Sequence, residues 1–522
     1  MTRGRKHLNS AALPLRDDPT VRNFIARHGD LCARTILTGG QHARYQLVIA
    51  ALAATYLYDW KLLLGALGLL LSLFYVGGVG FRLVLVALSL LRRPALVVDR
   101  KELGAQADDT LPVYTVLIPL YKESEVVAKL VRAMDHLDYP HEKLDVKLLL
   151  EEDDFETVDL CRRIPLPSCV EVIVVPHALP KTKPKACNHG LMAARGEFLV
   201  IYDAEDRPDH DQLRKAVVAF RRVPADVACL QAKLNYYNTD QNALTKWFTL
   251  EYSALFDLIL PGLHCLGMPI PLGGTSNHFR TSVLQELGGW DPFNLTEDCD
   301  VGMRLHRHGW RTMVLDSTTW EEANSRLGNW MRQRSRWVKG FIQTHLVHSR
   351  SNVRTARDMG PLGFASYLLM VGGFSASTLL NPFFWAADLY GLAVAAGLPA
   401  SMWLLVYSDG LGALPVLSSP TSYLANFLWY AIALYSANLF FILIQVLGCA
   451  KRRLWRLLPY ALASPIYWAL ISFAGWKGFA QLFTRPFYWE KTTHGLTALD
   501  PEGAQAEAGT VATPTGRAGE TP

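Results

Sequence analysis

The sequence has no cysteine pair at the spacing of a metal-binding or redox motif. Its eight cysteines are scattered, none lies in a C-x-x-C pair, and none has a companion histidine at metal-ligand spacing. We therefore expect reduced thiols in a cytoplasmic environment, with neither a zinc site nor a disulfide framework.

Charge is also scarce. Only 19% of the 522 residues are charged, whereas 50% are hydrophobic. This composition is too apolar for an ordinary soluble enzyme and too charged for a bundle of membrane helices alone, so it indicates a soluble domain combined with membrane spans. The formal net charge of +5 is too small to suggest nucleic acid as a partner.

Residues 1–44 are polar and basic and lack the apolar core of a cleavable signal peptide, so we expect a cytosolic N-terminal tail. Residues 45–93 are mostly apolar, with a polar break at Asp59, and they end at Arg92 and Arg93. Their length suits two transmembrane helices. Because basic residues gather on the cytoplasmic side of a membrane, we expect the following domain in the cytosol and the protein in the cell inner (plasma) membrane.

Residues 94–350 show a different pattern, in which short β-branched runs alternate with amphipathic segments. The runs predict buried parallel strands at 113–120, 146–152, 170–176 and 197–203. Helical periodicity lies between them, over 123–137 and 183–196. This alternation predicts an α/β domain with a doubly wound, mostly parallel sheet, whose ligands bind beyond the carboxyl ends of the strands.

A polar cluster follows each predicted strand, at residues 119–123, 151–157, 181–188 and 203–206. Each cluster alone is typical of a solvated surface. Together, two acidic clusters and one lysine cluster at the same sheet edge suit a hard divalent cation, held by carboxylate oxygens, and a phosphate, held by lysine. The pattern predicts a site for a metal-bound nucleotide diphosphate.

Two further motifs lie downstream. In "LTEDCDVGMRL", residues 295–305, Thr296 is a candidate cap for a helix that starts with Glu297 and Asp298. These acids are either an ordinary helix start, favoured by the helix dipole, or they include a general base beside the pocket. "QRSRW", residues 333–337, is either a basic and aromatic cluster at a membrane interface or a functional motif.

Together these motifs resemble those of the membrane-embedded family 2 glycosyltransferases, a group that includes bacterial cellulose synthase, curdlan synthase, hyaluronan synthase and chitin synthase. The matching elements are PLYKE, the acidic end of the second strand, KACN, DAED, TED and QRSRW, and they occur in the family's order. The resemblance implies a GT-A-type domain inserted between N-terminal and C-terminal transmembrane helices.

The resemblance also implies roles for individual residues. Asp298 would be the catalytic base. A bound Mg²⁺ or Mn²⁺ would have its ligands among Asp203, Glu205 and Asp206, where Glu205 departs from the family's usual Asp-x-Asp and leaves open which of the last two touches the metal. Substrate contacts would come from Glu123, Asp153, Lys185, Asp203, Glu297, Gln333, Arg336, Trp337 and Lys491.

Within this set, Asp153 would face the nucleobase, with Glu152 or Asp154 as alternatives in the same acidic cluster. Lys185 and Arg336 would stabilise the departing diphosphate, and the Trp337 indole would stack under a sugar ring. An acceptor hydroxyl is a weak nucleophile, so a carboxylate must take its proton during attack. Direct displacement inverts the anomeric centre, so a UDP-sugar donor, guessed to be UDP-glucose, would give a β-linked product.

Residues 351–484 are expected to form a transmembrane bundle of about four spans, at 361–380, 383–407, 424–449 and 458–483. Asn381 and Pro382 would form a turn between the first two. Four spans return the chain to the cytoplasm after residue 484 but place the basic segment 451–456 outside, against the positive-inside tendency, whereas three spans reverse both placements.

Three other segments have simpler interpretations. Residues 244–274 are either an amphipathic interfacial helix and loop or a covering helix of the catalytic domain. Residues 485–499 resemble the family's gating loops and equally suit an interfacial anchor. Residues 500–522 are small, polar and proline-bearing, which predicts a disordered tail.

Three functions remain open. The first is a processive synthase that extends a β-linked polysaccharide such as a β-glucan and exports it, with a possible export partner subunit. The second transfers one sugar to a membrane lipid. The third, from another class, is a catalytically silent membrane receptor or transporter, which the intact acids Asp203, Glu205 and Asp298 argue against. The expected partners are a nucleotide sugar, a glycan or lipid acceptor, and membrane lipids.

Overall fold

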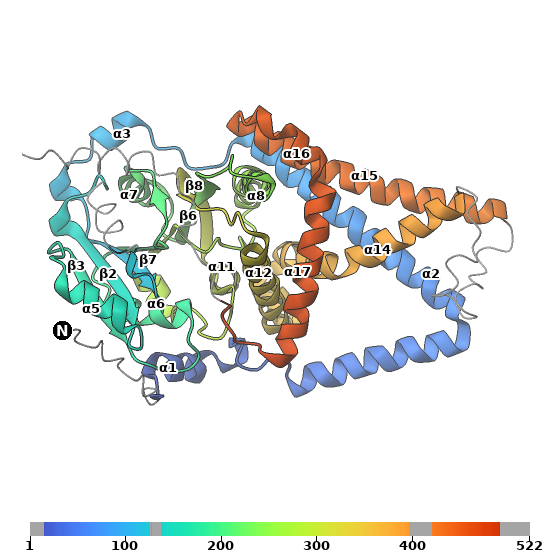
Figure 1. The fold of residues 1–522 in the computed structure, drawn as a ribbon, viewed down its shortest axis with the longest axis horizontal. Coiled ribbons are helices and arrows are strands. Elements are labelled where there is room, and N and C mark those ends of the chain that lie inside the picture. The colour runs from blue at the N-terminus through green and yellow to red at the C-terminus, as the bar shows by residue number, and fades with distance from the viewer. Residues whose placement is uncertain (1–14, 126, 128–136, 396–419, 491–522) are drawn as a thin grey trace, which may run out of the picture.

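The computed structural model describes residues 15–125, 127, 137–395 and 420–490. It consists of a lobe built on one β-sheet and an arm of long apolar helices that projects from it (Figure 1). Most of the helix expected over 123–137, and Lys491 with the rest of the C-terminal segment, lie outside the described residues.

One eight-stranded sheet forms the centre of the lobe, in the order β3-β2-β1-β4-β7-β6-β8-β5. The four strands predicted from the sequence are β1 (Tyr114–Leu120), β2 (Leu144–Glu151), β3 (Val170–Val175) and β4 (Phe198–Ile201). They pair in parallel, as predicted. Four strands were not predicted: β5 (Arg207–Pro208), β6 (Val227–Tyr236), β7 (Asn277–Arg280) and β8 (Arg311–Glu321).

The sheet is mixed because β7 runs antiparallel to both β4 and β6, and β5 runs antiparallel to β8. Since β6 and β8 are parallel to each other, they point the same way as β1 to β4. The carboxyl ends of six strands therefore meet at one edge of the sheet, which is where ligands bind in folds of this kind.

Each face of the sheet is covered by helices, which explains the continuous apolar runs in its strands. Leu117 and Leu149 pack into one core, whereas Val116 and Leu148 pack into the other, as the two-residue period of a strand requires. The helices of the lobe are α1 (Pro19–His28), α3 (Arg100–Gly104), α5 (Phe155–Arg163), α6 (Lys183–Met192), α7 (Gln212–Arg222), α8 (Ala243–Ala254), α9 (Leu260–Cys265), α10 (Thr281–Glu286), α11 (Glu297–Arg307) and α12 (Leu327–His348).

The segment expected to be an interfacial or covering helix lies between the sheet and the arm. α8 packs against β6 on one side and against the long helix α15 (Pro420–Arg452) on the other. A π-helical turn at Leu255–Ile259 joins α8 to α9, which packs on the end of α2. These helices therefore couple the sheet to the apolar arm.

The two N-terminal spans expected in 45–93 correspond to one helix, α2 (Gly39–Arg92), with a break at Asp59. The break divides it into two limbs that run away from the lobe and back (Figure 1). Asp59 has extended backbone angles, and its carboxylate accepts from the Leu62 amide at 3.2 Å. The returning limb, Leu69–Arg92, is long and apolar enough to cross a membrane.

The prediction of a turn at Asn381 and Pro382 is wrong. α13 (Asn352–Tyr367) continues through a π-helical turn into α14 (Gly373–Ala395), and Pro382 lies inside α14. A proline removes one donor from a helix, and neighbouring helices can satisfy the backbone around it. Here the Trp476 indole donates to the Leu379 carbonyl at 3.1 Å.

The end of the chain lies along the lobe. α16 (Leu458–Leu462) and α17 (Ser464–Thr484) follow α15, with a bend of 62° between Trp455–Leu462 and α17. α17 then runs beside α12 and across the direction of α15 (Figure 1). In the described part of 352–490 the chain therefore makes three helical runs, where four spans were expected.

This course brings to the lobe both segments that the expected spans place on opposite sides of a membrane, namely 451–456 and the segment after residue 484. At the end of α15, Lys451 donates to the Asp257 carbonyl at 2.6 Å, and Arg452 pairs with the Asp257 carboxylate. Arg456 pairs with Asp240 at 2.8 Å. The basic segment 451–456 and the segment after α17 both contact the lobe, so the two segments lie on the same side of the apolar arm.

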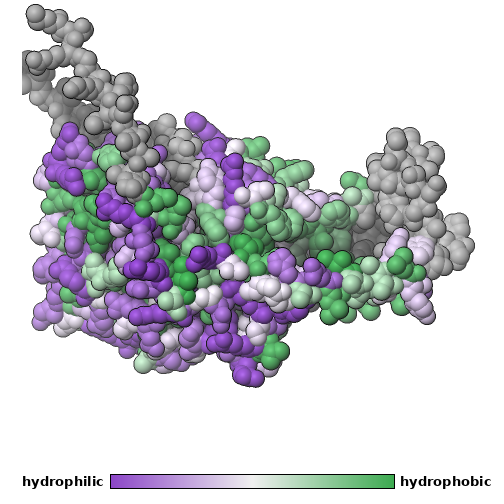
Figure 2. Space-filling model, turned by 90° about the horizontal axis from the view of Figure 1, so that it is seen from below, coloured by the Kyte–Doolittle hydropathy of each residue, from purple (hydrophilic) through white to green (hydrophobic). Residues whose placement is uncertain are grey.

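Two helices in the described part of the chain, Leu69–Arg92 and Asn352–Ala386, are long and apolar enough to span a membrane, and the bent pair at the C-terminal end would be a third if it counts as one span. Figure 2 shows hydrophilic residues over much of the lobe and hydrophobic ones along the arm. The surface therefore changes character where the arm leaves the lobe.

Close packing of α12 on α17 depends on Gly478. A Cβ atom at Gly478, in α17, would lie 2.4 Å from the Ser335 carbonyl oxygen of α12. A Cβ atom at Gly328, in α12, would meet nothing within 4 Å. We expect Gly478→Ala to destabilise the protein by about 1–3 kcal/mol through overpacking. Gly328→Ala should be neutral or stabilising, since alanine favours helices.

Thermal unfolding of the purified protein in detergent tests this expectation. A lower Tm for Gly478→Ala alone would support the close approach of the two helices. Equal unfolding temperatures for both variants would contradict it.

Candidate active site

A cavity of about 550 Å³ lies at the carboxyl edge of the sheet and continues between the apolar helices. Its walls combine three sets of residues. The loop after β1 and the segment that leads into α6 contribute Tyr121, Glu123, Lys181 and Lys183, and the loop after β4 contributes Asp203 and Glu205. The start of α11 and the length of α12 contribute Glu297, Asp298, Gln333, Arg334, Arg336, Trp337 and Phe341. The remaining residues come from the apolar helices and from other parts of the lobe, among them Glu251, Gly273 and Glu321.

Lys183 is one of two lysines that line the cavity, together with Lys181. It is the first residue of α6, and its ammonium group donates to Asp203 at 2.5 Å and to the Gly274 carbonyl at 2.8 Å. Burial alone would lower the pKa of Lys183, but the negative charges of Asp203 and Glu297 raise it above its ordinary value. Lys183 is therefore a fixed positive charge at the edge of the sheet.

Lys185, which was predicted to contact the donor, lies outside the cavity. Its ammonium group is fully buried and donates to Glu151 at 2.9 Å and to the carbonyls of Pro176 and Ala178, each at 3.1 Å. Two residues further along a helix, a side chain points to a different face. Lys185 thus holds the ends of β2 and β3 together.

The acids after β4 divide into two groups. Asp203 and Glu205 line the cavity. Asp206 lies behind them, where it accepts from the Asp203 amide at 2.8 Å and from the Thr275 hydroxyl. Burial, followed by the charges of Asp203 and Glu205, raises the pKa of Asp206 well above its usual range.

These acids suit a divalent cation in charge but not as a complete set of ligands. One carboxylate oxygen of Asp206 is buried without a hydrogen-bond partner. Within the described residues, no three His, Cys, Asp or Glu side chains are grouped closely enough to hold a metal ion by themselves. Mg²⁺ is commonly held by one or two carboxylates together with substrate phosphates, so a donor diphosphate would complete the set.

Glu297 and Asp298 stand at the start of α11, where both carboxyl groups face the cavity. Burial raises the pKa of Asp298 to about 6, and burial together with Asp298 raises the pKa of Glu297 to about 7. Thr296 occupies the N-cap position of this helix, as the sequence predicted, but its side chain makes no capping hydrogen bond. Its hydroxyl lies instead between Asn294, at 3.5 Å, and Thr344, at 3.4 Å.

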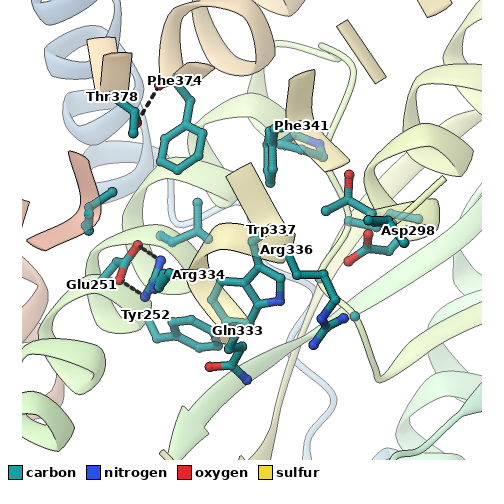
Figure 3. Close-up of a pocket in the computed structure, with 18 of the residues that line it drawn as sticks. Glu251, Tyr252, Asp298, Gln333, Arg334, Arg336, Trp337, Phe341, Phe374 and Thr378 are labelled. Atoms are coloured by element: carbon teal, nitrogen blue, oxygen red, sulfur yellow. Dashed lines mark hydrogen bonds and ion pairs between the residues drawn. The ribbon is translucent and has the colours of Figure 1, made fainter. Parts of the chain in front are cut away.

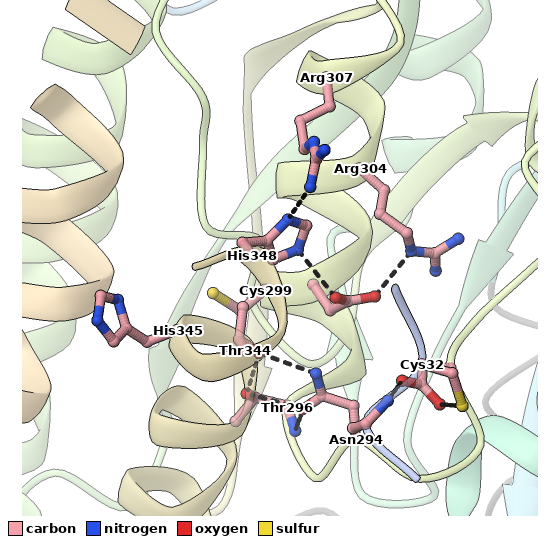
Figure 4. Close-up of polar contacts among 12 residues, drawn as sticks. Cys32, Asn294, Thr296, Cys299, Arg304, Arg307, Thr344, His345 and His348 are labelled. Carbon is pink, nitrogen blue, oxygen red and sulfur yellow. Dashed lines mark hydrogen bonds and ion pairs between the residues drawn. The ribbon is translucent and has the colours of Figure 1, made fainter. Parts of the chain in front are cut away.

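A buried polar network fixes α11 against α12. Asp300 accepts from Arg304 at 2.7 Å and from His348 at 3.0 Å, and His348 also contacts Arg307 at 3.2 Å (Figure 4). Because the Asp300 carboxylate bridges the two helices without access to water, it holds the acidic start of α11 in a defined place relative to QRSRW.

The QRSRW motif lies on α12, and four of its residues line the cavity: Gln333, Arg334, Arg336 and Trp337 (Figure 3). Burial lowers the pKa of Arg336, and the charges of Glu297 and Asp203 partly offset this effect. The Arg336 guanidinium also lies 4.1 Å from the centre of the Trp489 ring, beyond the end of α17.

Arg334, the second residue of the motif, was not predicted to matter. It pairs with Glu251 of α8 and donates to the Tyr467 hydroxyl at 2.7 Å, while its guanidinium lies 4.6 Å from the Trp337 ring (Figure 3). These partners are 83 and 133 positions away. No local pattern in the sequence could have identified them.

Two further predicted residues lie within the described part of the chain, Glu123 and Asp153. Glu123 lines the cavity. Asp153 pairs with Lys181, which also lines it. The two alternatives in the same cluster are engaged elsewhere, because Glu152 accepts from the His177 amide at 3.0 Å and Asp154 caps α5.

With this geometry in place, comparison with known proteins identifies the class. The family model "Glycosyltransferase like family 2" matches residues 112–340, from the start of β1 into α12. Probable glycosyltransferase YdaM of Bacillus subtilis (strain 168) is 25% identical over 306 residues, which are 57% of this chain and 72% of that protein. Residues 112–340 therefore match a family 2 glycosyltransferase domain, and the protein is a glycosyltransferase.

Two solved structures are also similar. Mannosyltransferase PcManGT from Pyrobaculum calidifontis, in complex with GDP-Man and Mn²⁺, matches with a TM-score of 0.43 and 20% identity, over 70% of this chain and 98% of that chain. TarS 1-349 of S. aureus, in complex with UDP-GlcNAc, matches with a TM-score of 0.36 and 12% identity, over 74% of this chain and 94% of that chain. The identification above rests on the family model and the curated relative.

The prediction that Asp298 is the base implies a pH dependence for sugar transfer, because its pKa is raised. A base must be deprotonated, so activity should be present above the pKa of about 6 and lost as the pH falls through it. We expect kcat/KM, which reports the free enzyme, to decrease about tenfold per pH unit below that value. Nucleotide binding measured over the same range is the control, and a kcat/KM that stays constant down to about pH 5 would contradict the assignment.

The two lysines of α6 predict opposite phenotypes. Lys183→Met should weaken binding of a nucleoside diphosphate about tenfold or more, with little change in Tm, because it removes a charge that faces the cavity. Lys185→Met should lower the free energy of unfolding by about 3–5 kcal/mol, because Glu151 is left buried without its partner. Titration calorimetry measures the binding effect and thermal unfolding the stability effect. Weaker nucleotide binding in Lys185→Met together with a lower Tm in Lys183→Met would indicate that Lys185 is the donor contact.

Proposed function

We propose that this protein is an inverting, metal-dependent glycosyltransferase that moves a sugar from a UDP-sugar to an acceptor that enters from between the apolar helices. The observation that carries the proposal is the continuity of the cavity. Asp203 and Lys183 at the sheet edge, Asp298 at the start of α11, and the aromatic and polar groups of α12 all line the same cavity as the apolar helices.

The chemical step follows from the charges. The Asp298 carboxylate takes the proton of the acceptor hydroxyl as its oxygen attacks the anomeric carbon from the face opposite the nucleotide. The bond between that carbon and the diphosphate breaks, and the diphosphate leaves with the electron pair. Lys183 and Arg336 stabilise the leaving group, since both are held where negative charge develops.

Asp203 and Glu205 are the proposed metal ligands, with Asp206 in support. Mg²⁺ or Mn²⁺ bound there would neutralise charge on the diphosphate. Asp206 accepts from the Asp203 amide and Thr275, so it fixes the loop that presents the other two acids. Asp153 and Lys181, which form an ion pair, are proposed to contact the nucleobase, and Glu123 is proposed to contact the donor.

Gln333 and Trp337 are proposed to hold the acceptor sugar. Trp337 is wedged between Tyr252, at a ring-centre distance of 6.4 Å, and the Arg334 guanidinium, so its orientation is fixed. An indole fixed in this way offers a flat apolar surface to a sugar ring. The resemblance to cellulose and curdlan synthases supports a β-linked polysaccharide, made at the plasma membrane and exported, as the product, with UDP-glucose as the donor.

The segment after α17 is proposed to respond to the donor. Lys339 donates to the carbonyls of Arg485, at 3.1 Å, and Tyr488, at 3.2 Å, and Glu490 pairs with Lys477 at 2.9 Å. These contacts hold Trp489 over Arg336. This placement supports the gating role expected for residues 485–499, to which Lys491, outside the described residues, would add a charge near the diphosphate.

Single transfer to a membrane lipid is a second candidate. The observation that favours it is the composition of the far wall of the cavity, where Phe74, Val79, Leu369, Met370 and Phe441 offer an apolar surface suited to an acyl or isoprenoid chain.

Transfer of label from radiolabelled UDP-glucose tests the proposed function. Membranes that contain the full chain, supplied with Mg²⁺ or Mn²⁺, should produce labelled polymer in an alcohol-insoluble pellet, and EDTA should abolish it. Asp298→Asn should reduce transfer by about 10²–10⁴-fold, because the base is lost while its shape is kept. The control is Asp226→Asn, which removes an exposed acid paired with Arg311 at the amino-terminal ends of β6 and β8, opposite the carboxyl edge where the site lies.

Label in the organic phase instead of the pellet would support the lipid candidate over the polymer. No transfer from a panel of nucleotide sugars, or full activity in Asp298→Asn, would contradict the proposed mechanism.

A further inference from the structure

Arg82 is an arginine inside an apolar helix that lines the far part of the cavity. It belongs to Leu69–Arg92, the limb of α2 that is apolar enough to span a membrane. Its guanidinium donates to the Gly78 carbonyl of the same helix at 3.2 Å and lies 5.4 Å from the centre of the Phe441 ring of α15.

Among the described residues, no carboxylate forms an ion pair with Arg82, whereas the buried arginines Arg304 and Arg334 each have one. A charged side chain in such a helix is costly and commonly faces a cavity or a partner. One backbone carbonyl and one aromatic ring offset only part of this cost. The geometry leaves a guanidinium, with its planar set of donors, exposed to whatever enters the cavity.

The level of Arg82 along the helix is also informative. Three residues later, the Leu85 backbone packs against Gly262 of α9, and Ser89 donates to the Asp257 carbonyl at 3.1 Å. At 1.5 Å per residue, Arg82 lies only about 4–5 Å beyond this contact, where the lobe ends and the apolar arm begins. A lipid whose head enters the cavity at this level would bring its phosphate to the guanidinium, and lipid phosphates pair with basic side chains.

The walls beside Arg82 are of two kinds. Phe74, Val79 and Phe441 are apolar, whereas the Tyr75 hydroxyl faces Asn381 at 3.4 Å. An anionic head followed by an apolar chain matches this pattern better than a neutral glycan does, because sugar hydroxyls would leave the arginine without a counter-charge.

We propose that Arg82 binds a phosphate group on a lipid, which is the acceptor or the anchor on which the glycan grows. The guanidinium holds the phosphate, the chain lies against the apolar walls, and the end to be extended points along the cavity toward Trp337 and Asp298. This inference rests on the proposed function for the meaning of the site, but phosphate-lipid binding can be measured without any transfer reaction.

The test is thermal unfolding of the purified full chain in a neutral detergent, with three matched probes. Dioctanoyl phosphatidic acid carries phosphate and tails, dioctanoylglycerol carries tails alone, and glycerol 3-phosphate carries phosphate alone. We expect a saturable rise in Tm with phosphatidic acid and little with either of the others. The half-saturating concentration should increase about tenfold or more in Arg82→Gln, through loss of charge-assisted hydrogen bonds, and less in Arg82→Lys.

Arg92→Gln is the matched control, because Arg92 is an exposed arginine at the end of the same helix. It should bind phosphatidic acid as the unaltered protein does. The rise in Tm caused by UDP and Mn²⁺ is measured in each preparation. It reports binding at the donor site and shows that Arg82→Gln is folded.

A rise in Tm with dioctanoylglycerol as large as that with phosphatidic acid would overturn the proposal. So would an equal effect of phosphatidic acid on the Tm of Arg82→Gln and of the unaltered protein. A shift with glycerol 3-phosphate as large as that with phosphatidic acid would overturn the lipid part, since it would show a site for soluble phosphate. If phosphatidic acid raises Tm but UDP with Mn²⁺ does not, the proposed function is contradicted and the phosphate site stands. If UDP with Mn²⁺ raises Tm but phosphatidic acid does not, only the phosphate site is contradicted.

Discussion

The balance of charge across the cavity is the constraint on which the site depends. Lys183 and Arg336 approach from α6 and α12, and the acids Asp203, Glu297 and Asp298 approach from β4 and α11. In a buried setting neither set could be held alone, because an unpaired charge is costly there. Burial is the main cause that raises the pKa values of Glu297 and Asp298, whereas Lys183 and Arg336 lower both, so these cations help the two acids to keep their charge.

The rest of the structure serves to bring these charges together. The parallel strands deliver Asp203 to the sheet edge, the Asp300 network fixes α11 against α12, and α17 holds α12 from the other side through the close approach at Gly478. α8 joins the same assembly through the pairing of Glu251 with Arg334. The catalytic lobe and the apolar arm therefore share the helix that carries QRSRW.

The sequence could predict what local pattern determines. The four parallel strands, the helix after TED and the gathering of acids at one edge follow from two-residue and helical periods and from the rule that ligands meet the carboxyl ends of strands. It could not choose among three lysines within five residues, because the choice of Lys183 over Lys185 depends on where α6 begins. Nor could it place α17, whose direction is set by packing against α12, or foresee that Pro382 would lie inside a helix.

The central claim is a single direct displacement with Asp298 as base and the acceptor on the side of the apolar helices. The most direct measurement is the anomeric configuration of the first product, by proton NMR, with whichever α-linked nucleotide sugar supports transfer. A β-linked product formed without a covalent sugar–enzyme intermediate is the expected result. An α-linked product would require two displacements or a different base, and it would contradict this account of the site.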